Sequence, residues 1–244
     1  KGKNILLEGT QGTMLDFYLE QWPYVTARQT HAAAWFAECG LSPRLNNKVI
    51  MVMRTYPIRV AGNSGSLPGE IGWGDLARRF HTAGVERVSM EDVTAFEEME
   101  TTVKLEWGMP NYSLHLYGGG ERVIWSEQLV NIHKEVLTRL GVETTQRLSK
   151  LFELTTVTKK LRRIAQMDTE VTIKAIRINR PDVIFMNFLN YLFPQDWGKK
   201  SWSELSDEAK QWIIDFQSSY TVPIGWVSTS ATDVIQVPIN HDTF

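Results

Sequence analysis

Short apolar runs that end in polar turns recur along the chain and predict its strands. These runs occupy residues 5–7, 49–53, 183–186 and 222–227. Unbroken apolar runs are typical of strands that are buried on both faces of a parallel sheet. Helical spacing between these runs predicts helices at residues 31–39, 74–80, 126–141, 169–179 and 206–218. The expected caps are Thr30, Ser126, Asp168 or Thr169, and Ser206. Strands that alternate with helices predict an α/β domain, in which helices flank a mainly parallel sheet.

One segment breaks this alternation of runs and helices. Residues 112–117 alternate between polar and apolar side chains, and three glycines follow at 118–120. Such a pattern predicts a β-hairpin. We therefore expect a small hairpin insertion at about residues 101–125.

The polar turns after the apolar runs are candidate ligand sites. Gln11 stands between Gly9 and Gly12 directly after the first run, and glycines let a backbone approach a ligand closely. Arg59 precedes a loop rich in glycine and serine, which suits contact with a sugar or phosphate, although a flexible surface loop has the same composition. Similar turns follow near Asn187 and Ser228. Open α/β sheets bind ligands at strand ends, so we expect one extended cleft.

A second candidate lies between residues 147 and 180, where basic residues outnumber acidic ones and threonines stand among them at 155, 156 and 158. Threonine hydroxyls give oriented hydrogen bonds, and arginine holds a carboxylate with two parallel ones. The segment therefore suits a small anion that carries carboxylates or phosphate. A solvated charged face is the commoner explanation of such a run.

Composition limits the remaining possibilities. The chain has 244 residues, 43% hydrophobic and 22% charged, with a net charge of −2, which argues against a general nucleic-acid binder. Cys39 is the only cysteine, so no internal disulfide is possible. No apolar run approaches the roughly 18 residues of a membrane span, and we expect a cytoplasmic protein. The apolar run begins almost at Lys1, which suggests the later part of a longer chain.

Taken together, these motifs resemble the second half of the adenylosuccinate synthetase family. Residues 5–12 resemble its strand followed by Glu-Gly-Ala-Gln-Gly, residues 24–26 its Tyr-Val-Thr, and residues 59–60 its Thr-Arg-Val-Gly loop. Residues 155–163 resemble its aspartate loop, and residues 222–229 its closing Val-Pro-Ile and Ser-Thr motifs. The loop at 56–65 and the threonines are closest to the viral branch that makes the 2-aminoadenine deoxynucleotide precursor. The resemblance implies that residues 1–244 form the C-terminal portion of a P-loop-NTPase-like synthetase domain.

The resemblance implies a ligase that joins L-aspartate to C6 of a purine 5′-monophosphate. The monophosphate is IMP, or dGMP in the viral branch, and a nucleoside triphosphate first phosphorylates O6. The implied monophosphate-binding residues are Gln11, Gly12, Thr26, Val60 and Ala61. The implied aspartate-binding residues are Thr156, Val157, Thr158, Lys160 and Arg162. The implied residues for the triphosphate base are Asn187, Phe188, Asn190, Ser228 and Ser230.

The chain departs from the family pattern at two of these places. Lys160 stands where the family usually has arginine, so a bidentate grip becomes a point charge. Asn190 replaces the aspartate that reads guanine, and an amide can pair with the donor and acceptor edge of adenine. These changes favour ATP over GTP.

The family's phosphate loop, general base and catalytic histidine have no counterpart here. We therefore expect no catalytic residue and no ligand of the implied Mg²⁺ within this chain. The family implies a homodimer, and the missing half could also be a separate chain. Two alternatives stay open: a catalytically incomplete paralogue that only binds purine nucleotides, and, with little support, a nucleic-acid binder that uses the basic segment.

Overall fold

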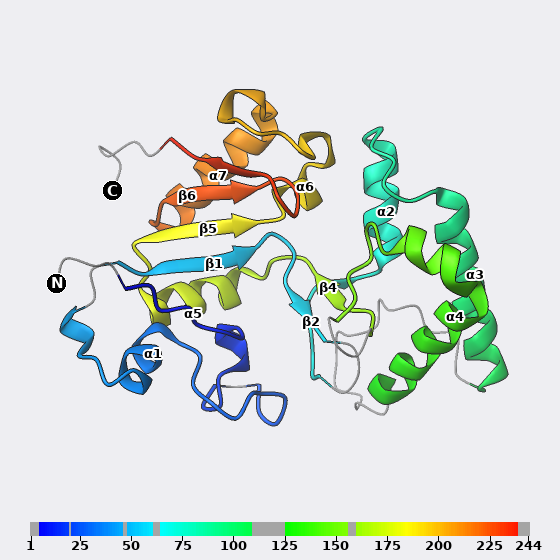
Figure 1. Ribbon diagram of the computed structural model, residues 1–244, viewed down its shortest axis with the longest axis horizontal. Coiled ribbons are helices and arrows are strands. Elements are labelled where there is room, and N and C mark those ends of the chain that lie inside the picture. Colours follow the sequence, from blue (N-terminus) through cyan, green and yellow to red (C-terminus); the bar gives the residue numbers. More distant parts are fainter. Residues whose placement is uncertain are drawn as a thin grey trace.

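The computed structural model describes residues 5–19, 21–45, 48–60, 64–108, 125–155 and 160–238, and the structural statements below concern those residues. Figure 1 shows a larger sheet with its helices on one side and a second region of helices and short strands beside it. Within the described residues, no helix is both long and apolar enough to cross a membrane.

The larger sheet is mainly parallel, as the sequence predicted. Its order is β1-β5-β6-β7, with β1 (Ile50–Arg54), β5 (Val183–Asn187) and β6 (Ile224–Ser228) parallel. The last strand, β7 (Val234–Gln236), is antiparallel to β6. The three parallel strands therefore end at the same edge of the sheet, as strand ends do in ligand-binding α/β folds.

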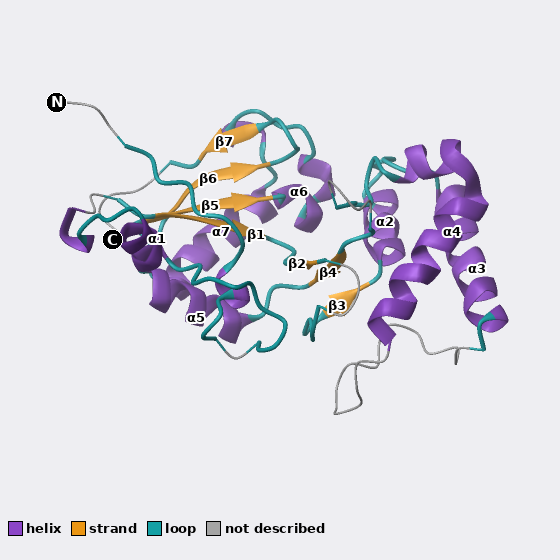
Figure 2. Ribbon diagram, turned by 60° about the horizontal axis from the view of Figure 1, so that its bottom comes forward, coloured by secondary structure: helices purple, strands orange, loops and turns teal. Residues whose placement is uncertain are grey.

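Two helices with the predicted caps cover one face of this sheet. The side chain of Asp168 accepts the Val171 N–H at 2.9 Å and begins α5 (Thr169–Asn179). Ser206 begins α7 (Asp207–Tyr220) in the same way. Figures 1 and 2 both place α5 and α7 on the same side of the sheet. Apolar residues of the sheet and of α7 form the core between them: Ile184, Met186, Ile224, Val227, Ile235, Ala209, Ile213 and Phe216.

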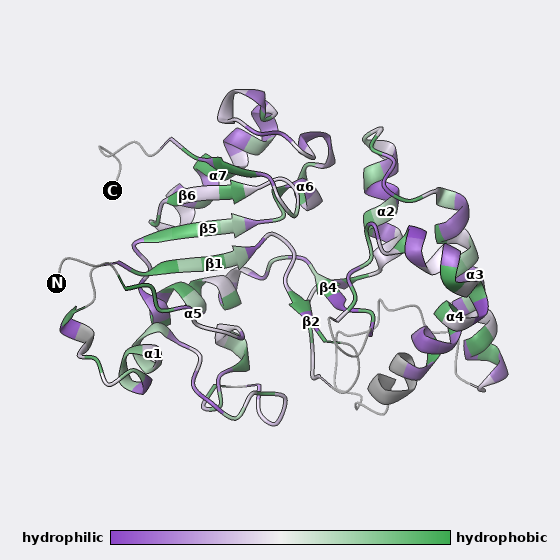
Figure 3. Cartoon of the chain, in the orientation of Figure 1, coloured by the Kyte–Doolittle hydropathy of each residue, from purple (hydrophilic) through white to green (hydrophobic). Residues whose placement is uncertain are grey.

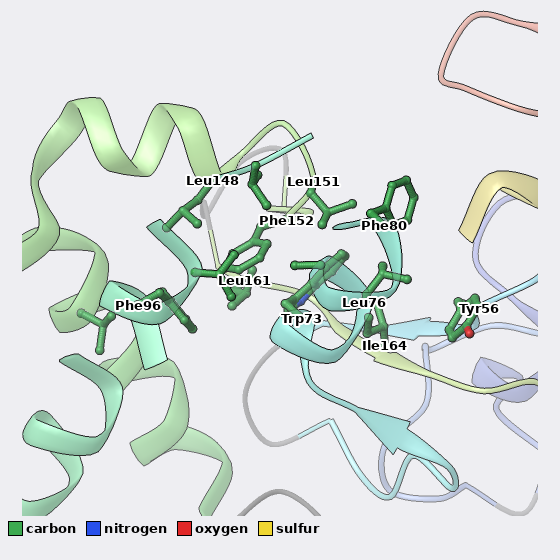
Figure 4. Packing of buried hydrophobic residues seen from close by; sticks show 14 of the residues in the cluster. Tyr56, Trp73, Leu76, Phe80, Phe96, Leu148, Leu151, Phe152, Leu161 and Ile164 are labelled. Atoms are coloured by element: carbon green, nitrogen blue, oxygen red, sulfur yellow. The ribbon is translucent and has the colours of Figure 1, made fainter. Parts of the chain in front are cut away.

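The second region is built on a small antiparallel sheet of order β2-β4-β3. Its strands are β2 (Ile58–Arg59), β3 (Glu70–Ile71) and β4 (Arg163–Ala165), and its helices are α2 (Trp73–Thr82), α3 (Met90–Glu106) and α4 (Trp125–Leu148). The left-handed φ of 82° at Gly141 interrupts α4, close to where the sequence predicted its end. Aromatic and aliphatic side chains pack together between these elements, among them Trp73, Leu76, Phe80, Phe96 and Phe152 (Figure 4).

Shorter elements complete the described chain. They are η1 (Thr13–Leu15), α1 (Ala32–Glu38), η2 (Pro43–Leu45), α6 (Leu189–Leu192), η3 (Pro194–Asp196) and η4 (Trp202–Glu204), where η marks a 3₁₀ helix. The side chain of His31, rather than that of Thr30, caps α1.

The prediction of a buried strand at residues 5–7 is wrong. This segment has no regular structure, and Ile5 and Leu6 are 78% and 83% exposed. β1, the other apolar run near the start, is an edge strand whose Val52 is 62% exposed. An apolar run becomes a buried strand only where neighbours pair with it and cover it. No described strand pairs with residues 5–7, and β1 pairs with β5 on one side only.

The hairpin prediction is wrong at both of its ends. Residues 101–106 belong to α3, and Trp125 begins α4. On α3, the buried residues Val93, Phe96 and Val103 recur at helical spacing and form its core-facing side. The hydroxyls of Thr101 and Thr102 donate to carbonyls one helical turn earlier. The alternating residues 112–117 and the glycines 118–120 lie outside the described residues.

Candidate functional site

The turn at Gln11 and Gly12 opens the candidate site. Gln11 has a φ of 71°, which is uncommon for a residue with a side chain, and it is exposed. Backbone outliers of this kind cluster at ligand sites, where the surrounding structure holds them. η1 follows directly, and the Leu15 N–H donates to the Gly12 carbonyl at 2.8 Å. The turn is therefore fixed on its C-terminal side.

A buried carboxylate that the sequence did not single out holds this turn to the chain beyond it. Asp16 is 1% exposed, and its two oxygens accept the Thr30 N–H at 2.6 Å and the Tyr18 N–H at 3.0 Å. The Thr30 hydroxyl in turn donates to the Gly12 carbonyl at 2.9 Å. Hydrogen bonds from backbone N–H groups to a carboxylate are among the stronger ones in proteins, so Asp16 fixes the turn relative to Thr30.

Thr26 lies against the same turn. Its N–H donates to the Leu15 carbonyl at 2.8 Å, and the Phe17 N–H donates to the Arg28 carbonyl at 3.1 Å. Two segments that the sequence assigned to one ligand, at Gly12 and at Thr26, are thus joined by backbone hydrogen bonds.

Arg59 connects this pair of segments to the loop that follows β2. Its guanidinium donates to the Ser64 carbonyl, to the Tyr24 carbonyl at 3.4 Å and to the Gln21 side chain at 3.1 Å. Arg59 is only 9% exposed, and burial together with the charge of Arg163 lowers its pKa. All three acceptors are neutral, so this buried cation is held by hydrogen bonds and not by a carboxylate.

A second arginine fixes the same loop from the neighbouring strand. Arg163 pairs with Arg59 across β2 and β4, and it donates to the Gly65 carbonyl at 2.7 Å and to the Ser64 hydroxyl at 3.1 Å. The Ser64 hydroxyl donates to the Val60 carbonyl at 2.6 Å. Glu70 accepts two hydrogen bonds from Arg163, at 2.8 and 2.6 Å, and neutralises it.

Gly65 is required at its position for two reasons. Its φ of 83° is unfavourable for other residues, and a Cβ there would lie 2.6 Å from the ring of Tyr24. The aromatic ring of the Tyr24 segment therefore packs directly on the loop backbone. The predicted monophosphate residues Gln11, Gly12, Thr26 and Val60 thus lie on segments tied together by one network, whereas Ala61 lies outside the described residues.

The segment predicted to bind aspartate lies at the same end of the small sheet as Val60. Because β2 and β4 are antiparallel with Arg59 opposite Arg163, the chain after Arg59 runs beside the chain before Arg163. Arg162 is fixed by its N–H to the Glu153 carbonyl at 2.8 Å and by its carbonyl, which accepts Trp73 Nε1 at 2.7 Å. Lys160 is exposed. Thr156, Val157 and Thr158 lie outside the described residues.

Three of the residues predicted to bind the triphosphate base come together at the ends of β5 and β6. Asn187 ends β5, and the Phe188 N–H donates to the Ser228 hydroxyl at 2.8 Å. Phe188 has a left-handed φ of 61°, and its carbonyl accepts the Thr55 hydroxyl at 2.5 Å. The guanidinium of Arg54 lies 4.0 Å from the centre of the Phe188 ring, so one face of this ring is already covered.

Asn190 and Ser230, the other two residues predicted to bind the base, are buried. Asn190 is 0% exposed, and neither its Nδ2 nor its Oδ1 has a hydrogen-bond partner among the described residues. Such an orphaned amide is costly and calls for a partner outside the described chain. The Ser230 hydroxyl donates to the Asp233 carboxylate at 2.6 Å and accepts two backbone N–H groups, so it already has its partners.

The single cleft predicted from four strand ends is only partly found. Asn187 and Ser228 share the edge of the larger sheet, but Arg59 belongs to the small sheet and residue 8 follows no strand. Arg54 at the end of β1 links the two regions, because it pairs with Glu153, which also accepts the Tyr191 hydroxyl at 2.9 Å. Burial and the neighbouring Glu153 raise the pKa of Tyr191.

No cluster of three or more histidine, cysteine, aspartate or glutamate side chains that could hold a metal ion occurs within the described residues.

Comparison with known proteins places these features in one family. The sequence profile described as Adenylosuccinate synthetase matches residues 1–197. The adenylosuccinate synthetase of Methanocaldococcus jannaschii is 25% identical over 94% of this chain and 46% of its own length. The N6-succino-2-amino-2′-deoxyadenylate synthase of Vibrio phage phiVC8 is 28% identical over 80% of this chain and 37% of its own length.

Two solved structures share the fold. The cyanophage S-2L succinoaminodeoxyadenylate synthetase, bound to dGMP and to dATP as an energy donor, superposes with a TM-score of 0.52 at 24% identity, over 95% of this chain and 45% of its own. Adenylosuccinate synthetase from Plasmodium falciparum gives a TM-score of 0.54 at 15% identity, over 95% and 49% of the two chains. The chain thus spans about half the length of the relatives it matches. It belongs to the adenylosuccinate synthetase family.

Proposed function

We propose that this chain forms the purine monophosphate-binding and aspartate-binding part of a ligase that joins L-aspartate to C6 of a purine 5′-monophosphate. The observation that carries this proposal is the network through Asp16, Arg59 and Arg163. It ties the Gly12 turn, the Thr26 segment and the Val60 loop together, with the Arg162 segment at the same end of the small sheet. Segments far apart in sequence are fixed by buried groups, as preorganised binding sites require.

In the proposed monophosphate site, Gln11 holds the O6 and N1 edge of the purine and Thr26 the 5′-phosphate. The backbone of Val60 and Ala61 contacts the sugar, and Gly12 allows close approach. Buried Arg59 contributes a positive charge near these groups without a carboxylate to cancel it, which favours a dianionic phosphate.

In the proposed aspartate site, Thr156, Val157 and Thr158 give hydrogen bonds to the carboxylates, and Arg162 grips one of them. Lys160 adds a point charge. The reaction proceeds in two displacements. O6 of the purine attacks the γ-phosphorus of the triphosphate while the N1 proton passes to a general base, which we place in the unmatched half, and the diphosphate leaves. The aspartate amine then attacks C6, loses one proton and expels inorganic phosphate. Electrostatic neutralisation of the 6-oxyphosphoryl group is the main requirement of such a reaction.

We propose dGMP as the monophosphate and ATP as the energy donor, with IMP and GTP as the alternatives. The phage relative is named as a 2-amino-2′-deoxyadenylate synthase, and the cyanophage structure holds dGMP and dATP. Asn190, which has both amide atoms unpaired, supplies a donor and an acceptor, as adenine needs. Asn187, Phe188, Ser228 and Ser230 are the other proposed contacts of this base.

This chain matches about half of the length of its relatives. The proposed enzyme is complete only together with a polypeptide that corresponds to their other half. We place the catalytic residues and the ligands of Mg²⁺ there. A cytoplasmic homodimer is the proposed assembly. The alternative is a binding paralogue without catalysis, which keeps the same network.

An assay of the complete natural gene product tests the proposal. It follows the succinylated product with dGMP or IMP, ATP or GTP, and aspartate. Turnover of dGMP with ATP is the expected result, and Asn190→Asp is expected to shift the preference towards GTP. Monophosphate binding without any turnover would favour the binding paralogue, and turnover with GTP but none with ATP would rule out the donor assignment.

A further inference from the structure

The two faces of the larger sheet are covered very differently. One face is covered by the core under α5 and α7. That core contains Met186 and Val227, and Met51 and Met53 pack against it. Side chains alternate between faces along a strand, so their neighbours in sequence point the other way. The pairing register joins those neighbours into one row across the sheet, Val52–Phe185–Trp226–Gln236.

This row belongs to a face that no described helix covers. Val52 is 62% exposed, and Ile50 and Val234, which flank the row, are also exposed. Phe185 and Trp226 are partly exposed and are absent from the core on the opposite face. α5 and α7 lie together on the other side in Figures 1 and 2, and Figure 3 shows hydrophobic residues along most of β1 and β5. We call Ile50, Val52, Phe185, Trp226 and Val234 the open face.

An open face of this kind does not fit a mainly parallel sheet. Parallel sheets occur almost only with both faces covered, and a contiguous apolar patch marks a contact surface. β1 is also an edge strand, whose outer side pairs with no described strand. A second, separate feature points the same way, because Ile5 and Leu6 form an apolar run typical of a strand and yet are exposed. The open face and the run at Ile5 and Leu6 are therefore both apolar surfaces that no described segment covers.

The relatives indicate what supplies these neighbours. The chain matches 46% of the Methanocaldococcus synthetase and 45% of the cyanophage structure, so each contains a further stretch longer than this chain's match. We propose that the open face and the edge of β1 bind the polypeptide that corresponds to this unmatched half, which covers Val52, Phe185 and Trp226 and provides neighbours for the run at Ile5. This inference rests on the proposed function only for the identity of the occupant. The polypeptide can be continuous with this chain or separate from it.

Cysteine labelling tests the inference without any catalytic readout. Cys39 is the only cysteine among the 244 residues. In a Cys39→Ser background, the engineered cysteine is therefore followed as a single labelled peptide by mass spectrometry, whatever cysteines the rest of the gene product contains. Val52→Cys reports on the open face, and Ile214→Cys on α7, where Ile214 is also exposed, is the matched control. Maleimide labelling is compared between the 244-residue chain and the complete natural gene product with any separately encoded half.

We expect Val52→Cys to react about tenfold or more slowly in the complete product than in the 244-residue chain, and Ile214→Cys to react equally in both. Equal rates at Val52→Cys in the two proteins would overturn the proposal. Protection already present in the 244-residue chain, together with a doubled mass by light scattering, would assign the face to a second copy and would also overturn it.

A stability measurement covers the case in which the 244-residue chain does not fold alone. In the complete product, Val52→Asp is expected to lower the Tm by about 5 °C or more, because it places an unpaired charge in a covered contact. Ile214→Asp is expected to leave the Tm nearly unchanged. Equally small effects of the two substitutions would contradict the proposal, whatever the activity of the enzyme.

Discussion

The region around the small sheet and the region around the larger sheet are stabilised in different ways. The former contains largely buried ion pairs, among them Arg163–Glu70 and Lys104–Glu100, and the pair Arg54–Glu153 joins it to the larger sheet. The latter has an apolar core on one side and an open face on the other, and in α6 it contains the Asn190 amide, which has no partner among the described residues. The first region holds most of its buried charges in such pairs, although Arg87 Nε and His133 Nδ1 have no hydrogen-bond partner among the described residues. The second region leaves an apolar sheet face uncovered, and both polar atoms of the Asn190 amide lack a partner among the described residues. We infer that the segments proposed to bind the monophosphate are preorganised in this chain and that the proposed site for the triphosphate base is not.

The largest expected change in stability comes from removing the Arg163–Glu70 ion pair of the first region. Arg163→Ala leaves the Glu70 side chain, which is only 4% exposed, without its cation. We expect the free energy of unfolding to fall by about 3–5 kcal/mol, as for other broken buried pairs. Urea unfolding measures it. The control is Arg78→Ala, whose pairs with Asp75 and Glu97 are exposed and are expected to contribute about 0–1 kcal/mol. Equal losses in the two variants would contradict the difference between the regions.

The next effect depends on pH and belongs to the contact between α3 and α4. Burial by itself would raise the pKa of Glu100, but His133 and Lys104 overcome it and hold that pKa at about 2. A lowered pKa stabilises the folded state above the ordinary pKa of 4.5, and this contribution is lost as the pH falls from about 4.5 towards 2. We expect a loss of about 2–3 kcal/mol over that range.

Glu100→Gln is the matched variant for this pH dependence. Its free energy of unfolding should change less with pH below 4.5 than that of the natural chain, because the amide does not titrate. Denaturant unfolding at pH 5, 4 and 3 compares the two. An identical pH dependence in both proteins would show that Glu100 does not carry the effect.

The second region is expected to respond in the opposite direction. Asn190→Leu removes a fully buried amide that has no partner among the described residues. We expect the free energy of unfolding to rise by about 1–2 kcal/mol, because burying an unpaired polar group is unfavourable. Affinity for the triphosphate should fall in the same variant. A marked loss of stability would mean that the amide already has a partner.

The smallest effect is expected at the exposed ion pair of the second region. Lys210 and Asp207 lie 3.5 Å apart at the start of α7, with Asp207 fully exposed. Lys210→Ala should change the free energy of unfolding by less than about 0.5 kcal/mol. A larger change in thermal unfolding would indicate that surface charges also matter in this region.

The sequence predicted the parts of the fold that depend on local chemistry. The caps at Asp168 and Ser206 and the strand at residues 183–186 are found where they were expected, because a cap needs only the residues that follow it. The strand at residues 5–7 was wrong because burial depends on neighbours that sequence does not reveal. The hairpin was wrong at residues 101–106 because the helical spacing of Val93, Phe96 and Val103 was the stronger pattern.

The candidate site was predicted residue by residue but not as a network. Arg59 was singled out for the loop it precedes. Its hydrogen bond to the Tyr24 carbonyl depends on a segment 35 residues away, and its place opposite Arg163 depends on pairing between strands about a hundred residues apart, neither of which a local pattern reveals. The role of Asp16 was missed. Its one signal in the sequence is an acidic residue four positions after Gly12, and this signal does not distinguish a ligand contact from the structural role that Asp16 has here.

Native-state hydrogen exchange of the 244-residue chain, with and without millimolar dGMP or IMP, tests the central claim most directly. If one preorganised monophosphate site exists in this chain, exchange should slow together at residues 10–15, 24–30 and 58–60, and it should stay unchanged at the ends of β5 and β6. Slowing at only one of the three segments, or at none, would contradict the claim that the network through Asp16, Arg59 and Arg163 builds a single site.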